Sequence, residues 1–159
     1  MTQPDYDAWF RSYAEAYTRA LAGPVEIELI RSFYAETVLA LGVDSAFSVA
    51  NATDTAMNAV MEYLFGFYAS IGMHRMDIDH VEVSPLHENH DRIKVFYVGR
   101  YTGPDGSPVT IPNEVVYLVQ RRAAGPRIFA FIAGDETILF KQHGLIDEDG
   151  EPIPRVAGH

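Results

Sequence analysis

The hydrophobic pattern of the chain changes its period at Gly72, and no other feature limits the possible folds as much. Before Gly72, apolar residues recur every three or four positions, which is typical of amphipathic helices. After it, they alternate along four segments that we predict to be strands, at residues 73–83, 92–101, 109–120 and 127–135. The connections are short and rich in turn residues, so neighbouring strands should be antiparallel. Helices followed by such strands predict an α+β fold with the helices on one face of the sheet.

Three helices are predicted in the N-terminal half. The first begins at Tyr6 and is stopped by Gly23, after which a proline suits the first turn of the second helix. The third is capped by Thr53 and ended by Gly72. Residues 37–42 are apolar and β-branched, which predicts a short strand followed by a loop.

The chain is long enough for one hydrophobic core, and we expect a single domain over residues 1–146. Residues 137–146 form another apolar run, which either extends the last strand or makes a terminal turn. The remainder, residues 147–159, is expected to be a loose tail.

Composition excludes several classes of function. The formal charge of −10 opposes binding to nucleic acid and to anionic membrane surfaces. Without cysteine there is no disulfide framework and no thiolate for catalysis or zinc. His87 and His90 fall in a predicted hairpin loop, and no glycine-rich phosphate loop is present, so neither a metal nor a cofactor is predicted. The N-terminus lacks the pattern of a signal peptide and no apolar stretch would span a membrane, so a cytoplasmic location is expected.

The order of these elements resembles the NTF2-like superfamily, also called cystatin-like α+β. This superfamily includes ketosteroid isomerases, limonene epoxide hydrolases, scytalone dehydratases and polyketide cyclases of the SnoaL type. The resemblance covers about residues 5–145 and rests on residues 17–42, on residues 54–72 and on the strands. It implies three helices packed on a strongly curved, mixed but mainly antiparallel sheet. Such a sheet forms a cone, and the interior of the cone is a pocket for a small apolar molecule.

Tyr17 lies where the resemblance places the tyrosine that donates a hydrogen bond to the substrate oxyanion of ketosteroid isomerases. A phenol in a dry pocket is a strong donor toward an oxygen that develops charge. The alternative is that Tyr13 and Tyr17 are core aromatics, since aromatic stripes at helical spacing usually serve packing. The general base of the isomerases would fall near Ala40 or Leu41, neither of which accepts a proton, and this argues against their mechanism.

Two other residues are candidates for acid–base chemistry. His80 alternates with apolar residues on a predicted strand, and Asp135 follows an unusually apolar run. The alternatives are a satisfied core or interface group for His80 and a solvated turn residue for Asp135. Arg75 and Asp77 have the Arg-x-Asp spacing of the epoxide hydrolases but lie on an earlier strand, where a surface salt bridge is expected.

Alternation along residues 109–120 puts Asn113, Val115 and Tyr117 on the face that the resemblance makes the pocket. Together with Tyr13 and Phe131 they are the predicted ligand-binding residues. Asn113 follows a proline, and the alternative for it is a place in a bulge or at an edge.

Three functions follow from this sequence. The favoured one is binding of a small apolar molecule that carries a carbonyl or hydroxyl group. The alternative is a cofactor-free isomerase, dehydratase or polyketide cyclase with Tyr17 as donor and His80 or Asp135 as acid or base. The further alternative is a non-catalytic interaction module whose interior is filled by side chains. Because Phe96 and Val98 make one strand apolar on both faces, a homodimer is also expected.

Overall fold

The computed structural model describes residues 2–51 and 56–156. Thr53, the expected helix cap, therefore lies outside the described residues. The helices in these ranges are α1 (Tyr6–Ala22), α2 (Ile27–Arg31), α3 (Ala56–Ser70) and α4 (Glu136–Gln142). The strands are β1 (Tyr34–Gly42), β2 (Phe47–Asn51), β3 (Met73–His87), β4 (His90–Thr102), β5 (Pro108–Arg122) and β6 (Gly125–Ala133).

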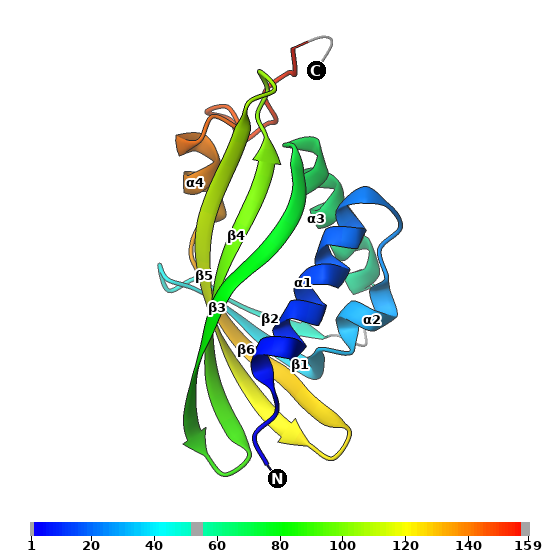
Figure 1. Ribbon diagram of the computed structural model, residues 1–159, viewed down its shortest axis with the longest axis vertical. Coiled ribbons are helices and arrows are strands. Elements are labelled where there is room, and N and C mark those ends of the chain that lie inside the picture. The colour runs from blue at the N-terminus through cyan, green and yellow to red at the C-terminus, as the bar shows by residue number, and fades with distance from the viewer. Residues whose placement is uncertain (1, 52–55, 157–159) are drawn as a thin grey trace.

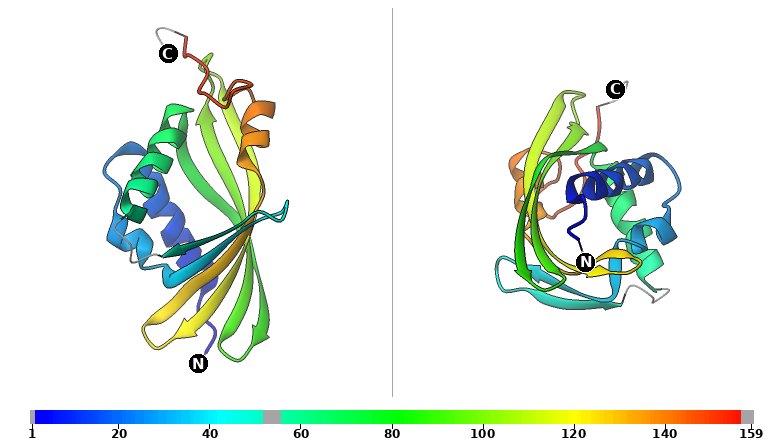
Figure 2. Two further views of the ribbon diagram at one scale, coloured as in Figure 1. Left: turned by 180° about the vertical axis from the view of Figure 1, so that it is seen from behind. Right: turned by 60° about the horizontal axis from the view of Figure 1, so that its bottom comes forward.

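The strands form one six-stranded sheet in the order β2-β1-β6-β5-β4-β3. Neighbours are antiparallel except for β1 and β6, which run parallel, so the sheet is mixed. Helices α1, α2 and α3 lie together on one side of the sheet (Figures 1 and 2). The predicted α+β class, with the N-terminal helices on one face, is confirmed.

Helix α1 has the predicted bounds, and both ends have a physical cause. The Asp5 side chain caps the N-terminus by accepting a hydrogen bond from the Ala8 amide at 3.1 Å. The helix ends at Gly23, whose amide donates to the Arg19 carbonyl. The buried stripe of α1 consists of Tyr6, Phe10, Tyr13, Ala14, Ala16, Tyr17 and Ala20. This stripe fixes the phenols of α1 against the inner face of the sheet.

The chain after α1 differs from the prediction in two places. Helix α2 has a single turn, because the chain is already extended at Tyr34 and forms β1 from there to Gly42. Strand β2 lies within the expected loop. Its Phe47 and Val49 are mostly exposed, so it lacks the buried alternation by which a strand is predicted.

The β3–β4 hairpin is longer than predicted. The strands continue to His87 and His90 and leave a turn of Glu88 and Asn89 alone. Asn89 has a φ of 59°, which asparagine tolerates better than most residues. The predicted loop was too long because polar and turn-forming residues such as Pro85, His87 and His90 belong to the strand ends, and composition does not separate strand from turn there.

The C-terminal part also differs. Residues 136–142 form α4 instead of extending β6, and Phe140, Leu145 and Ile146 after β6 are buried. The expected loose tail contacts the β4–β5 turn: Arg155 donates to the carbonyls of Thr102 and Gly103 at 2.9 and 3.1 Å. These two bonds hold the described part of the tail against the end of the sheet.

Candidate functional site

A cavity of about 510 Å³ lies between the helices and the β1–β2 end of the sheet. Its described wall is formed by Tyr13, Tyr17, Ile30, Arg31, Tyr34, Val38, Ala40, Val49, Ala50, Asn51, Met57, Val60, Met61, Leu64, Phe65 and Phe131. We call it the large cavity. Its volume is in the range that holds drug-sized ligands, about 300–1,000 Å³, and its wall is mainly apolar.

Tyrosine hydroxyls supply most of the polar groups on this wall. The hydroxyl oxygens of Tyr13 and Tyr34 lie 2.8 Å apart and share a hydrogen bond. Burial raises the pKa of both phenols and that of Tyr17, so all three stay protonated near neutral pH. Arg31 donates to the Asn58 side-chain oxygen at 3.3 Å. The large cavity is therefore mainly apolar, with neutral phenols on the side of α1 and β1 and the charged Arg31 from α2.

A second cavity of about 20 Å³, the small cavity, lies at the other side of Tyr17. Its wall consists of Tyr17, Tyr68, Met73, Met76, Tyr97, Gly99, Tyr101, Ile111, Asn113, Glu136, Leu139 and Phe140. Tyr17 is the one described residue that lines both cavities. The α1 phenol that the sequence singled out thus separates an apolar space from a smaller, aromatic one.

Glu136 is the carboxyl group of the small cavity. The Tyr68 hydroxyl donates to its Oε2 at 2.6 Å. Burial raises the pKa of Glu136, and the hydrogen bond from Tyr68 offsets part of that rise. A carboxyl with a raised pKa inside a protein is a typical component of functional sites.

The structure brings most of the predicted ligand-binding residues to the interior. Tyr13, Tyr17 and Phe131 line the large cavity, and Asn113 lines the small one. The Tyr117 hydroxyl shares a hydrogen bond with that of Tyr97 at 2.7 Å. Val115 is partly buried against the core. Alternation along β5 therefore placed these side chains on the correct face.

The Asn113 side chain is partly engaged by its own strand. Its Oδ1 accepts a hydrogen bond from the Glu114 amide at 3.0 Å. Asn113 is also one of the residues that line the small cavity. Of the two alternatives, a bulge is not seen, because Asn113 pairs with Tyr97 of β4 without a register shift, whereas its position beyond the last β5–β6 pair, Val115–Ala133, is a local sheet edge.

His80 is not in the interior, and the prediction that it faces the pocket is corrected. Its ring is half-exposed, lies 2.6 Å from Asp79 through Nδ1, and stacks on Phe96 with ring centroids 4.1 Å apart. The register of β3 against β4 shifts between Ile78 and His80. This irregularity moves His80 off the inward face, which strict alternation from Met76 and Ile78 would have given it.

Asp135 is also placed outside the cavities. Its exposed side chain caps α4 by accepting a hydrogen bond from the Thr137 amide at 2.9 Å. Its neighbour Glu136 carries the inward carboxyl instead. The sequence reasoning missed Glu136 because it extended the strand pattern past Ala133. An N-cap aspartate followed by an acid and an apolar run was the signal for a helix start.

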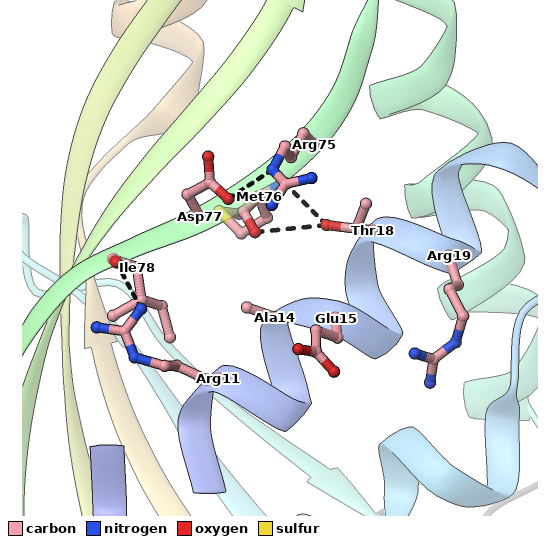
Figure 3. Close-up of a pocket in the computed structure, with 9 residues that line it drawn as sticks. All are labelled: Arg11, Ala14, Glu15, Thr18, Arg19, Arg75, Met76, Asp77 and Ile78. Carbon is pink, nitrogen blue, oxygen red and sulfur yellow. Dashed lines mark hydrogen bonds and ion pairs between the residues drawn. The ribbon is translucent and has the colours of Figure 1, made fainter. Parts of the chain in front are cut away.

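A third hollow, of about 310 Å³, lies between α1 and β3 (Figure 3). Arg11 donates to the Ile78 carbonyl at 3.0 Å, and Thr18 accepts from the Met76 amide at 3.0 Å. These bonds join the helix to the strand. Arg75 pairs with Asp77 at 2.6 Å, which confirms the expected surface salt bridge. We interpret this groove as a solvated seam, since its arginines are exposed and ion-paired.

The described residues form neither a cluster of metal ligands nor a membrane-spanning helix. Within residues 2–51 and 56–156, no three His, Asp or Glu side chains come together in a way that would hold a metal ion. Nor does any helix of this part of the chain have the length and hydrophobicity to cross a membrane.

Comparison with known families settles the relationship of the chain. A family model described as NTF2-like protein (DUF6841) matches residues 4–136. The chain belongs to this NTF2-like family. The resemblance inferred from the order of the elements is thereby confirmed. None of the curated proteins matches the chain in sequence.

Several solved structures share the fold. An NTF2-like protein with a cystatin-like fold from Novosphingobium aromaticivorans is 11% identical, with a TM-score of 0.62 over 82% of this chain and 79% of that one. The protein Aln2 from a Streptomyces species is 9% identical, with a TM-score of 0.61 over 85% and 91% of the two chains. A protein with a cystatin-like fold from Caulobacter vibrioides is 13% identical, with a TM-score of 0.57 over 80% and 84%. At these identities the similarity concerns the fold alone.

Proposed function

We propose that this NTF2-like protein binds one small, largely apolar molecule in the large cavity, inside a cone formed by the sheet and the helices. The observation that carries this proposal is an apolar space of about 510 Å³ with phenol groups on one side. A ligand that carries a carbonyl or hydroxyl group would accept a hydrogen bond from Tyr17, or from the Tyr13–Tyr34 pair. Burial of the apolar body supplies affinity, and the phenols orient the ligand.

The chemistry of the wall favours binding over catalysis. Among the described residues that line the large cavity there is no histidine and no carboxylate, and Arg31 is the charged residue. Ala40 contributes a methyl group at the position where the resemblance would place a general base. His80 and Asp135, the predicted acid–base residues, are exposed and lie elsewhere. A proton-transfer enzyme needs such a group within hydrogen-bond reach of its substrate.

We propose in addition that the face of the sheet away from the helices pairs two copies of the chain. Partly buried apolar residues on this face include Val98, Val116, Leu118 and Ile132, which alternate with inward-facing neighbours. Apolar side chains gathered on one face of a sheet are commonly covered by another protein surface. Sedimentation at micromolar concentration tests the dimer, and a monomeric mass at all concentrations would refute it.

Binding to the large cavity can be tested with the neutral, fluorescent probe N-phenyl-1-naphthylamine. We expect saturable enhancement of its fluorescence with one site per chain. Ala40→Phe fills the cavity and should weaken binding by about tenfold or more, the equivalent of about 1.4 kcal/mol. Leu39→Phe adds a ring at the neighbouring position of β1, outside the cavity wall, and serves as the matched control.

Three outcomes would contradict the proposal. One is the absence of saturable probe binding by the natural protein. Another is unchanged binding by Ala40→Phe when thermal melting shows that this variant is folded. Equal losses in Ala40→Phe and Leu39→Phe would also contradict a specific site, because the two substitutions differ mainly in the face of β1 that they alter.

A further inference from the structure

The small cavity has a wall of aromatic rings, which come from four different elements. The rings belong to Tyr17 of α1, Tyr68 of α3, Tyr97 and Tyr101 of β4, and Phe140 of α4. The centroid of the Phe140 ring lies 6.2 Å from that of Tyr68 and 6.0 Å from that of Tyr101. The Tyr17 and Tyr68 rings are 5.9 Å apart. The rings of Tyr17, Tyr68, Tyr101 and Phe140 therefore form a connected series of neighbours on the wall of the small cavity.

Glu136 adds a negative charge to this aromatic wall. It is the charged residue among the described lining, and Asp135 beside it adds to the negative potential. No lysine, arginine or histidine lines the cavity in the described part of the chain. The hydrogen bond of 2.6 Å from Tyr68 is the polar contact of the carboxyl group that the structure shows. The carboxyl is thus held by a neutral partner among ring faces.

A carboxylate on a wall lined by several aromatic rings is suited to one chemical class of ligand. Ring faces carry negative electrostatic potential, so they attract a cation placed over them, and a carboxylate does so more strongly. We propose that the small cavity binds a primary ammonium group, with Glu136 as its counter-ion and the surrounding aromatic rings as its cage. The site is separate from the large cavity, although both touch Tyr17, and it does not depend on the function proposed above.

The size of the cavity decides which ammonium ions it accepts. A cavity needs a volume of about 10–15 Å³ to hold a group the size of a water molecule. With about 20 Å³, the cavity has room for ammonium or the head of methylammonium, but a tetramethylammonium ion would clash with the rings. Met76, Asn113 and Leu139 on its wall are partly exposed, so the rest of a longer amine has a way out.

A proton competes with the proposed cation. The groups that face Glu136 are Tyr17 from α1, Tyr68 from α3, Tyr97 and Tyr101 from β4, and Asp135 from its own segment. Burial raises the pKa of these phenols, so they stay neutral. It also raises the pKa of Glu136, so the carboxyl is protonated more readily than an exposed one. Ammonium binding should therefore strengthen as the pH rises through the pKa of Glu136.

The experiment uses methylammonium chloride as the probe, followed by its methyl resonance in saturation-transfer NMR at constant ionic strength with sodium chloride. We expect saturable binding at about pH 8 that weakens toward about pH 5, and weaker binding of tetramethylammonium. Glu136→Gln should weaken methylammonium binding by about tenfold or more. Glu88→Gln removes the same charge from the exposed β3–β4 turn and should leave binding unchanged.

The proposal fails if the natural protein shows no saturable methylammonium binding, if Glu136→Gln binds as well, or if tetramethylammonium binds equally. If Glu136→Gln does not fold, the proposal is tested by the melting temperature of the natural protein with methylammonium or with sodium. Methylammonium should raise it above the sodium control at about pH 8 and less at about pH 5, and no difference would refute the site. Unchanged binding of N-phenyl-1-naphthylamine by Glu136→Gln separates this result from the large cavity.

Discussion

The hydroxyl of Tyr6 donates to the carboxylate of Asp91 across 2.6 Å, and this contact joins the first turn of α1 to the start of β4. Asp91 is fully buried, and Arg121 on β5 binds it through two further contacts at 2.7 and 2.8 Å. Three elements that are far apart in the sequence therefore meet on one carboxylate. Such a charge is stabilising only while all its partners are present.

Asp91→Asn should destabilise the protein by about 3 kcal/mol, because it leaves the largely buried Arg121 without its counter-charge. The hydrogen bond from Arg121 holds the pKa of Asp91 below its usual range. The stabilisation is thus complete above the ordinary carboxyl pKa of about 4 and is lost as the pH falls through the folded value. Urea unfolding at neutral and acidic pH measures this, with the exposed Asp79→Asn as control.

The Glu136 carboxyl should make protein stability depend on pH in the opposite direction to Asp91, and Glu136→Gln tests this. Because the folded protein raises the pKa of Glu136, the ionised carboxyl opposes folding, and stability falls as the pH rises above the ordinary value of about 4.3. The glutamine avoids this penalty and still accepts the hydrogen bond from Tyr68. We expect the variant to be more stable than the natural protein at neutral pH, with the difference shrinking toward acidic pH. A gain that does not change with pH would contradict this account.

The pair formed by Tyr13 and Tyr34 should be energetically coupled. Each Phe substitution removes one hydroxyl of the shared hydrogen bond and should cost about 1 kcal/mol. The double variant should lose less than the sum, since it leaves no unpaired partner. Chemical unfolding of the four proteins of this double-mutant cycle gives the coupling energy, and strict additivity would show that the two hydroxyls do not depend on each other.

Two glycines at and near the end of α3 provide a matched pair of substitutions. Gly72 has a φ of 92°, and a Cβ there would overlap the carbonyl oxygen of Thr102. Gly72→Ala should therefore cost about 2 kcal/mol or more. Gly66 lies within α3 with nothing within 4 Å of an added Cβ. Gly66→Ala should stabilise the protein by about 0.5–1 kcal/mol. The confirming result would be a lower melting temperature for Gly72→Ala and a higher one for Gly66→Ala than for the natural protein.

The sequence predicted the elements whose pattern is regular. Helix α1 and the inward face of β5 follow undisturbed periods of 3.6 and 2, and Tyr17, Asn113 and Tyr117 were located by them. Prediction failed where the backbone departs from its period. The register shift before His80 turned that side chain to the outside. Because a new helix starts at Glu136, the inward carboxyl is one position beyond the predicted Asp135.

The cavities themselves could not be predicted, because they depend on how separate elements meet. Tyr68 lies on α3 and is buried, but its partner Glu136 lies 68 positions later in the chain. No local pattern relates two such residues. A sequence specifies which side chains are apolar, whereas an unfilled space depends on the distance between the sheet and the helices that cover it.

The parallel pairing of β1 with β6 has a consequence for how the chain is made. Strand β6 lies between β1 and β5, so the N-terminal β1–β2 pair joins the rest of the sheet only when β6 is available. While the ribosome is still synthesising the chain, β1 and β5 each expose an unpaired edge, which invites aggregation. Completion of the sheet therefore waits until β6 has been synthesised, and the many long-range contacts should make folding slow. A chain that ends before residue 125 lacks β6 altogether and would keep both edges open.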